Sequence, residues 1–401
     1  MEDWCVLPLV AMEDITQQWL RKVLIFALNS DITLKSWNVR KQEGKVGVAG
    51  EICFIEVTFT TRTPLKKQDQ KEWKVEQEVE LDQKQELEYS KFLVVKLFPK
   101  DKNKIKTMKK EKFGEREVEF YKYASTQEFK RFCRESGIVQ PVPRMYWAGM
   151  SEKALTIVLH DLTSDNYTTL VPPEGISLCE VKVIVESVAI IHASGFAKIT
   201  NSSRDFFDIP WDGGFPSEQV LSGLNMQIPM FALAPTVDNL KALKSLIPEL
   251  LHLVYRFPFM ETLIHGDLWT GNVMFSKDLR SVSIIDWQFM HLSNPVCDLL
   301  TLLLMSSNPI VYQEHLAEVL ECYWLSFEKV LIKNGVRSKL NVSLHNLFEN
   351  VEAMWMYGFM FFSAAFPHLM SYQMMSENRA KTVVSFLEKR GVFEKFLASK
   401  H

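Results

Sequence analysis

The spacing of apolar residues divides the chain into a strand-rich first part and a helix-rich remainder. Four runs in the first part are rich in β-branched and aromatic residues and predict strands, over residues 31–40, 52–61, 92–98 and 154–159. Between the last two runs, residues 110–123 have apolar positions at helical spacing, so that Phe113, Glu117 and Phe120 share one face of a predicted helix. These elements predict a small, β-rich lobe.

From residue 178 onward, apolar residues recur every three or four positions, which is typical of amphipathic helices. Helices are predicted within residues 178–192, 239–255, 298–327 and from 346 to the end, with one short strand over 282–285. Pro248 is expected to bend the second of these helices. We therefore predict an α+β fold with a β-rich lobe at residues 1–160 and a larger, mainly helical lobe at residues 161–401.

Residues 62–91 carry a dense mixture of acidic and basic side chains between two predicted strands. Trp73, Val75, Val79 and Leu81 occur among them at alternating positions, as in a strand that extends a hairpin. A mixed run of charges more commonly forms a solvated excursion without chemistry of its own. Both interpretations stay open at this point.

The segment 353–370 contains no formally charged residue and is rich in aromatic residues and methionine. Gly358, Ser363, Pro367 and His368 interrupt it, so its strongly apolar part is shorter than the roughly 20 residues that a bilayer span needs. Its flanks also lack the Lys/Arg asymmetry of membrane proteins. We expect a buried helix here and no membrane span.

Composition narrows the function classes further. With 47% hydrophobic and 24% charged residues, the chain has the composition of an ordinary globular protein. A formal net charge of −3 gives no reason to expect nucleic acid or an anionic membrane as a partner. The six cysteines are scattered without a CxxC pair, which favours reduced thiols, and the acidic first residues do not resemble a signal peptide. We expect a cytoplasmic protein.

Residues 263–275 read LIHGDLWTGNVMF and contain the strongest candidates for chemistry. Four residues separate Asp267 from Asn272, and thirteen more separate Asn272 from Asp286, which ends an apolar strand. Two carboxylates and an amide on loops at strand ends suit Mg²⁺, a hard cation that prefers oxygen ligands. In phosphoryl transfer, Asp267 would orient and deprotonate a substrate hydroxyl, while Asn272 and Asp286 would hold the metal. His265 would organise the loop.

An upstream pair supplies candidates for phosphate binding. Lys96 lies inside an apolar strand, where an unpaired ammonium would be costly to bury. Glu117 lies on the predicted inward face of the following helix and is its natural partner. Such a Lys–Glu pair would direct the lysine onto nucleotide phosphates, and an ordinary structural ion pair is the alternative.

Two further segments are weaker candidates for nucleotide binding. The loop 44–50 carries three glycines, among them Gly47 and Gly50, and glycine lets backbone amides approach phosphates closely. His160, Asp161 and Leu162 lie at the predicted junction of the lobes, where adenine would hydrogen-bond to the backbone. This second interpretation rests on position alone.

The order of these motifs resembles that of the kinase-like small-molecule phosphotransferases, which include aminoglycoside phosphotransferases, choline kinases and the ecdysteroid kinase-like (CHK kinase-like) family. The last fits best. HGDLWTGNVMF at 265–275, IIDWQ at 284–288 and NPVCDLL at 294–300 are similar to its catalytic loop, metal loop and following helix. FLVVKLFP, EREVEFYKY and VLHDL are similar to its strand lysine, helix glutamate and hinge.

The resemblance implies a protein-kinase-like two-lobed fold that binds ATP and Mg²⁺. It implies that Asp267 is the catalytic base and that Asn272 and Asp286 are the Mg²⁺ ligands. It also implies that Lys96 binds phosphate and that Asp298 is a buried acid that supports the catalytic loop.

The acceptor is expected to be a small molecule with a hydroxyl group. Only eleven residues lie between Asp286 and Asp298, too few for the long activation loop of a protein kinase, and Gly266 stands where protein kinases carry arginine. The aromatic segment 353–370 would favour an apolar alcohol such as a steroid if it faced the cleft, although such residues are more commonly core. A choline/ethanolamine-type or aminoglycoside-type kinase and a catalytically silent nucleotide-binding module are the alternatives.

Overall fold

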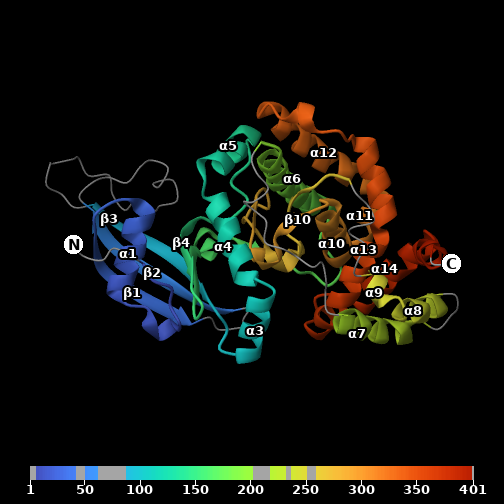
Figure 1. Ribbon diagram of the computed structural model, residues 1–401, viewed down its shortest axis with the longest axis horizontal. Helices are drawn as coiled ribbons and strands as arrows, with labels where there is room; N and C mark the ends of the chain where they lie inside the picture. The colour runs from blue at the N-terminus through green and yellow to red at the C-terminus, as the bar shows by residue number, and fades with distance from the viewer. Residues whose placement is uncertain are drawn as a thin grey trace. The chain divides into compact units, whose positions relative to one another are not determined.

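The computed structural model describes residues 6–41, 50–61, 87–201, 217–231, 236–250 and 259–399, which divide into two compact units (Figure 1). The N-terminal unit contains Met1–Thr126 and Val142–Asn166, and the C-terminal unit contains Gln127–Pro141 and Tyr167–His401. A sheet dominates the first unit and helices dominate the second, so the predicted α+β class is confirmed. The assignment of separate functions to residues 1–160 and 161–401 stays a prediction.

The N-terminal unit is built on a five-stranded antiparallel sheet in the order β1-β2-β3-β5-β4. Its strands are β1 (Ile32–Lys41), β2 (Glu51–Thr61), β3 (Leu87–Leu97), β4 (Met145–Met150) and β5 (Leu155–His160). Its helices and turns are η1 (Met12–Asp14), α1 (Gln17–Leu28), α3 (Lys102–Lys110), α4 (Phe113–Ala124) and η2 (Leu162–Asp165).

Burial with a period of two shows which face of this sheet is core. The buried residues on one face of β2 are Cys53, Ile55, Val57 and Phe59. They form one apolar cluster with the buried face of α1 and with Val95 and Leu97 of β3. Because successive residues of a strand point to opposite faces, Lys96 points away from this cluster and toward α4.

The four predicted strands correspond to β1, β2, β3 and β5, whereas α1, α3 and β4 are not anticipated by the sequence analysis. The helix predicted over residues 110–123 is α4, which begins only at Phe113. Lys112 has a positive φ of 55° and separates α4 from α3. The charged excursion is not tested, because residues 62–86 lie outside the described residues and 87–91 belong to β3.

Helices make up most of the C-terminal unit. They are α5 (Gln127–Ser136), α6 (Leu178–Asn201), α7 (Ser217–Gln227), α8 (Thr236–Lys244), α9 (Ile247–Leu250), α10 (Val296–Ser306), α11 (Pro309–Glu314), α12 (Leu316–Lys333), α13 (Leu344–Ser371), α14 (Glu377–Lys389) and α15 (Val392–Ala398). The helix predicted over residues 239–255 is divided between α8 and α9, and residues 251–258 lie outside the described residues. The other predicted helices are present.

Short strands and turns carry the loops of the same unit. They are β6 (Thr168–Thr169), η4 (Ile228–Met230), β7 (Thr262–Ile264), η6 (Thr270–Asn272), β8 (Val273–Phe275), β9 (Val282–Ile284), η7 (Trp287–Phe289), β10 (His291–Ser293) and η8 (Arg337–Lys339). β7 pairs with β10, and β6, β8 and β9 form a three-stranded sheet. Strand ends therefore bring the segments around residues 265, 272 and 286 close together.

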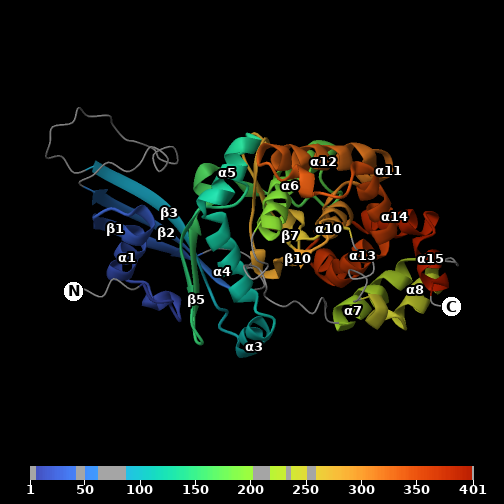
Figure 2. The same cartoon turned by 45° about the horizontal axis from the view of Figure 1, so that its top comes forward.

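The long helix α6 lies in the core of this unit. It packs along α12 and against β7, and Figures 1 and 2 show α6 and α12 side by side. By length and composition, α6 is the one helix among the described residues that could cross a bilayer, yet 72% of its apolar window is buried inside the protein. Packing within the unit therefore accounts for its apolar residues.

The uncharged segment 353–370 forms the middle of α13 and is a buried helix, as predicted. The aromatic side chains of Trp355, Phe359, Phe362 and Phe366 are each at most 1% exposed. α13 packs against α7 and α10. Its first turn is closed by a capping box, in which the side chains at positions 343 and 346 each accept a backbone N–H of the other residue.

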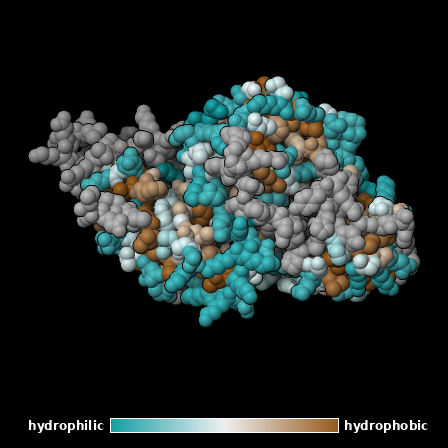
Figure 3. Space-filling view, viewed as in Figure 1, coloured by the Kyte–Doolittle hydropathy of each residue, from teal (hydrophilic) through white to brown (hydrophobic). Residues whose placement is uncertain are grey.

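Hydrophobic and hydrophilic residues are interspersed over the face of the molecule that Figure 3 shows. Single apolar side chains are exposed on helices of both units, such as Phe26 of α1 at 66% and Leu325 of α12 at 64%. Scattered exposure of this kind is ordinary for a folded protein. Neither side chain carries a functional inference.

Gly223 lies where α7 approaches α13, and a Cβ placed on it would collide with the backbone oxygen of Ser363. Beside this contact, Gln227 Nε2 donates to Ser363 Oγ at 3.2 Å. We expect Gly223→Ala to lower the free energy of unfolding by about 1–3 kcal/mol, because the helices must move apart to accept the methyl group. Urea unfolding followed by circular dichroism measures the change.

The matched control for this prediction is Ser222→Ala, at an exposed position of the same helix. It should change the free energy of unfolding by less than about 0.5 kcal/mol. Equal stability of the two variants would contradict a close approach of α7 and α13 at Gly223.

Candidate active site

The loop between β7 and β8 holds Asp267 and Asn272 together. Asn272 lies at the end of η6, and its Nδ2 donates hydrogen bonds of 2.9 Å to both the backbone oxygen and Oδ2 of Asp267. The backbone N–H of Asn272 donates to Trp269 O at 2.9 Å, which closes the turn between them. One side-chain amide therefore fixes the direction of the Asp267 carboxylate.

His265 joins this loop to the one that carries Asp286. The Asp267 N–H donates to His265 Nδ1 at 3.1 Å, so Nε2 carries the proton and donates to Ile285 O at 2.9 Å. Burial lowers the pKa of His265, which keeps the imidazole in this neutral form. Ile285 N donates in turn to Asn272 O at 2.9 Å. These bonds bring together the three residues for which the sequence predicts catalysis and metal binding.

Asp286 has an unusual backbone conformation. Its φ is 64°, in the left-handed region that disfavours residues with a side chain. Such a conformation persists only where the surrounding structure determines it, and it is common at functional sites. Here the hydrogen bonds of Ile285 on one side and the turn η7 on the other hold it in place.

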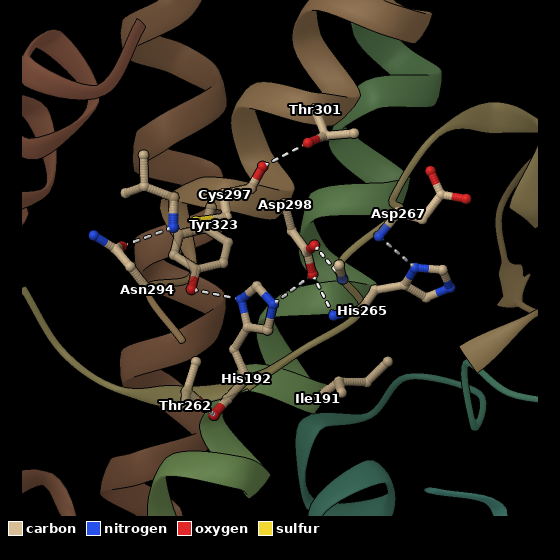
Figure 4. Close-up of polar contacts among 12 residues, drawn as sticks. Ile191, His192, Thr262, His265, Asp267, Asn294, Cys297, Asp298, Thr301 and Tyr323 are labelled. Atoms are coloured by element: carbon tan, nitrogen blue, oxygen red, sulfur yellow. Dashed lines mark hydrogen bonds and ion pairs between the residues drawn. The ribbon is translucent and has the colours of Figure 1, made fainter. Parts of the chain in front are cut away.

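A buried carboxylate, Asp298 in the first turn of α10, supports the loop between β7 and β8 (Figure 4), which is called the catalytic loop below after the predicted role of Asp267. Its Oδ2 accepts the backbone N–H of His265 at 2.7 Å, and its Oδ1 accepts that of Gly266 at 2.9 Å. Gly266 has a φ of 81°, and a Cβ on it would lie 2.5 Å from Phe289 O. Asp298 therefore holds a turn that only glycine can make without strain. This contact matches the supporting role that the resemblance implies for Asp298.

His192 of α6 extends this support to α12. Its Nε2 lies 3.2 Å from Asp298 Oδ2 and donates to it, so its Nδ1 accepts the hydroxyl proton of Tyr323 at 2.9 Å. Burial raises the pKa of Tyr323 well above its ordinary value, so the hydroxyl stays protonated and donates. Burial by itself would raise the pKa of Asp298. The hydrogen bond from His192 is the largest of the interactions that outweigh this effect, so the pKa of Asp298 is lowered.

The surroundings of Asp267 make it a stronger base than an ordinary aspartate. Its removal from water, followed by the negative charge of Asp286, raises the pKa of Asp267 to about 8. The hydrogen bond from the side chain of Asn272 acts in the opposite direction. A carboxylate with a pKa near neutrality is suited to take a proton from a hydroxyl group.

Asn272 and Asp286 offer a small set of oxygen ligands. Because Asn272 Nδ2 binds Asp267, Oδ1 is the atom that this side chain would present to a cation. The described residues contain no group of three or more His, Cys, Asp or Glu side chains that could hold a metal ion by itself. Mg²⁺ is commonly bound by one or two protein groups together with substrate phosphates, which these two residues fit. Their role as metal ligands stays a prediction.

The predicted Lys96–Glu117 pair is formed within the N-terminal unit. Lys96 Nζ of β3 lies 2.6 Å from Glu117 Oε2 of α4, and the two residues are 8% and 1% exposed. The backbone of Gly50 packs beside the Lys96 stem, and a Cβ there would lie 2.7 Å from Leu97 O. Since an isolated buried ammonium is costly, the ion pair explains how Lys96 is tolerated at this position.

The other nucleotide-binding candidates are less defined. Gly47 lies outside the described residues. His160 ends β5 and Leu162 begins η2, with Asp161 as the N-cap between them. The backbone N–H groups of His160 and Asp161 already donate to carbonyl groups of the same unit. An adenine contact at this junction stays a prediction.

The structure adds supporting residues that the sequence analysis did not identify. The Thr270 N–H of the catalytic loop donates to Ser306 Oγ at 2.9 Å, at the end of α10. Arg379 of α14 is 1% exposed and donates from Nε to Ser307 O at 3.2 Å. Arginine and serine occur mostly on surfaces, so no sequence signal marks these two as internal. Together they connect the catalytic loop to the C-terminal helices.

The Asp298 carboxylate gives a pH-dependent prediction. Its pKa is lowered in the folded protein, so its contribution to stability is fully present above the pKa of an unfolded aspartate and is lost as the pH falls through the folded value. We expect Asp298→Asn to lower the free energy of unfolding by about 3 kcal/mol at pH 7, because buried donors lose a charged acceptor. Urea unfolding across the pH range measures the difference, which should shrink below about pH 4.

The matched control for Asp298→Asn is Asp238→Asn, at an exposed position of α8. This substitution should change the free energy of unfolding little at any pH. If the free energy of unfolding of the wild type exceeded that of Asp298→Asn by the same amount down to pH 2, this would contradict an ionised Asp298 in the folded protein.

Comparison with known proteins places the chain in a family. A family model described as the ecdysteroid kinase-like family matches residues 73–336. No curated protein matches the chain in sequence. Among solved structures, the chain is similar to an ethanolamine kinase from Plasmodium vivax, with 11% identity and a TM-score of 0.39 over 96% of this chain and 93% of that one.

Two further solved structures show a similar degree of likeness. A macrolide 2'-phosphotransferase type I has 13% identity and a TM-score of 0.37, over 93% of this chain and 98% of its own. A choline kinase from Streptococcus pneumoniae has 12% identity and a TM-score of 0.33, over 83% of this chain and 94% of its own. Structural similarity with such low identities and TM-scores does not bear on the activity of this chain.

The family match is stronger, because it covers well over half of the chain and includes both the Lys96–Glu117 pair and the segment from Asp267 to Asp298. The resemblance derived from the motifs is thereby confirmed. The chain belongs to the ecdysteroid kinase-like family.

Proposed function

We propose that this protein is an ATP-dependent phosphotransferase that moves the γ-phosphate to a hydroxyl group of a small molecule, with Mg²⁺ as cofactor. Membership of the ecdysteroid kinase-like family supports a small-molecule kinase. The observation that carries the proposal is the loop in which Asn272 holds the Asp267 carboxylate at 2.9 Å, near the charge of Asp286. Phosphoryl transfer depends mainly on positioning and on neutralising phosphate charge; this loop would position the acceptor, and a cation bound by Asn272 and Asp286 would supply the positive charge.

In the proposed reaction, Asp267 is the general base. Its carboxylate accepts the proton of the acceptor hydroxyl while the hydroxyl oxygen bonds to the γ-phosphorus. The bond between that phosphorus and the bridging oxygen breaks, and ADP leaves. Asn272 and Asp286 would hold Mg²⁺, which when bound would supply positive charge to neutralise the phosphates. Lys96, which is ion-paired with Glu117, binds nucleotide phosphate.

The proposed acceptor is a small hydrophobic alcohol, with steroids as the leading class. The chain between Asp286 and Asp298 is occupied by η7, β10 and the beginning of α10. This short connection supports a small acceptor, because a peptide substrate needs an activation-loop platform. Most aromatic residues of α13 do not contribute to acceptor binding, because they are buried in the core.

The first test of this function is Asp267→Asn. The substitution keeps the size of the side chain but removes the base, so kcat for transfer to an alcohol should fall by at least about 100-fold. Asp286→Asn should cause a comparable loss that higher Mg²⁺ partly restores, because the metal loses a charged ligand. Mass spectrometry of phosphorylated products from a panel of steroid and xenobiotic alcohols, with ATP and Mg²⁺, measures transfer.

The control for this test is Asp238→Asn. The carboxylate of Asp238 is exposed on α8, so its replacement should leave the activity at the wild-type level. A wild-type protein as inert as Asp267→Asn, both in transfer and in slow ATP hydrolysis, would show a catalytically silent nucleotide-binding module instead. Preferential phosphorylation of choline would overturn the hydrophobic acceptor but keep the phosphotransferase.

A further inference from the structure

The segment around α3 is strongly basic, although the chain as a whole carries a formal net charge of −3. Residues 100–112 contain seven lysines and two acidic residues, which gives this segment a net charge of +5. The lysines are Lys100, Lys102, Lys104, Lys106, Lys109, Lys110 and Lys112. Positive charge is therefore concentrated on one element, and the net charge of the chain does not reveal it.

The fold exposes these lysines and aligns three of them. Lys102, Lys106 and Lys110 follow one another at intervals of four residues, so they share one face of α3. Met108 is 4% exposed and lies about 200° round the helix from Lys106, so this face points away from the protein. Ile105 is half-buried, and every other residue of α3 is exposed. Figure 3 shows hydrophilic side chains where Figure 1 places α3. We call Lys102, Lys106 and Lys110 the lysine face.

The lysine face does not stabilise the helix that carries it. Lysines four residues apart repel each other, and a lysine in the first turn opposes the helix dipole. Asp101 caps the backbone of the first turn, and Lys110 Nζ lies 3.0 Å from Glu111 Oε1. Within the part of the chain that the structure describes, neither Lys102 nor Lys106 forms an ion pair. The stability of the fold therefore does not account for this charge, and an anionic partner does.

The composition of α3 favours a partner that presents many negative charges on a surface. An ammonium group is a hydrated point charge and lacks the planar fork with which arginine recognises a single phosphate. Residues 99–112 contain no arginine and no aromatic residue. Specific protein interfaces are rich in both and poor in lysine, and single-stranded nucleic acids stack on aromatic rings. Clusters of about four to eight basic residues on a helix are instead typical of binding to anionic lipids.

The apolar residues of α3 favour contact with lipid headgroups and exclude deep insertion. Interfacial helices that enter the acyl region do so with large apolar side chains on an exposed face. In α3, the apolar residues Ile105 and Met108 are half-buried and buried, and they lie away from the lysine face. Attraction between this face and a bilayer would therefore be electrostatic, and salt would screen it.

We propose that the lysine face of α3 docks this protein reversibly on anionic lipid bilayers, where Lys102, Lys106 and Lys110 lie against the charged headgroups. This proposal goes beyond the proposed function and does not depend on it, because docking needs neither bound nucleotide nor phosphoryl transfer. Each lysine close to an anionic surface adds to the attraction. Loss of all three should therefore weaken binding strongly.

The experiment measures sedimentation of the full-length protein with vesicles of phosphatidylcholine and phosphatidylserine in a ratio of about 2:1, near physiological ionic strength. We expect wild type to bind these vesicles and not vesicles of phosphatidylcholine alone. Lys102→Gln, Lys106→Gln and Lys110→Gln together should lower the partition coefficient by about 100-fold, because three charges are lost. Salt at about 1 M should release the bound wild type.

The matched control is a triple variant with Lys241→Gln, Lys277→Gln and Lys389→Gln. These lysines are exposed in the C-terminal unit, so the control loses the same charge at other places. Its partition coefficient should stay within about threefold of wild type, since the lysine face is intact. The α3 variant should melt no lower than wild type, because glutamine relieves the repulsion between lysines. A loss of binding in that variant is then not a loss of fold.

Three results would overturn the lysine face as a membrane-docking surface. One is equal binding of wild type to vesicles with and without phosphatidylserine, or equal binding by wild type and the α3 variant. Another is an equal loss of binding in the α3 variant and the control, which would show attraction by overall charge only. The third is binding of wild type to duplex DNA without binding to the anionic vesicles at the same salt concentration, which would indicate a nucleic-acid surface.

Discussion

The buried carboxylate of Asp298 is the interaction on which the catalytic loop depends. Its two oxygens accept the consecutive N–H groups of His265 and Gly266, and they do so from a fully buried position. An isolated carboxylate would be neutralised there, but three donors, including His192, favour the ionised form. The charge then fixes the direction in which the chain leaves β7, and with it the place of Asp267.

The hydrogen bonds and backbone conformations of the other site residues depend on the position that Asp298 gives to this loop. Once Gly266 makes its turn, His265 can donate to Ile285, and Asn272 can reach back to Asp267. The left-handed conformation of Asp286 is tolerated because the segment before it is already held. Groups that are positioned before substrate binds need little reorganisation during reaction, which is how such a network serves phosphoryl transfer.

The helix α13 connects the core of the helical unit to the site. Its middle is packed against α7 and α10, so the position of its last turn is determined by the core. That turn places His368 against Trp269 of the catalytic loop. Buried aromatic packing therefore acts on this loop indirectly, because it sets where His368 meets Trp269.

The sequence by itself determined the features that depend on short spacing. Asp267 and Asn272 lie within one loop, and strand alternation separates Lys96 from its core-facing neighbours, so that a buried ammonium required a partner such as Glu117. The class of fold and most strands followed from the same periodicity, because spacing encodes which face of an element is buried. The start of α4 was missed, because the positive φ of Lys112 leaves no pattern in the sequence.

Only the tertiary structure decided which distant residues complete the site. Tyr323, Ser306 and Arg379 lie on helices that meet the loop or its supports only after folding. It also decided that the aromatic segment is core in its middle and accessible at its end, since a uniform apolar run does not show where a helix leaves the packed interior. Local spacing specifies the chemistry that a segment can perform, whereas packing between segments specifies what supports it and what can reach it.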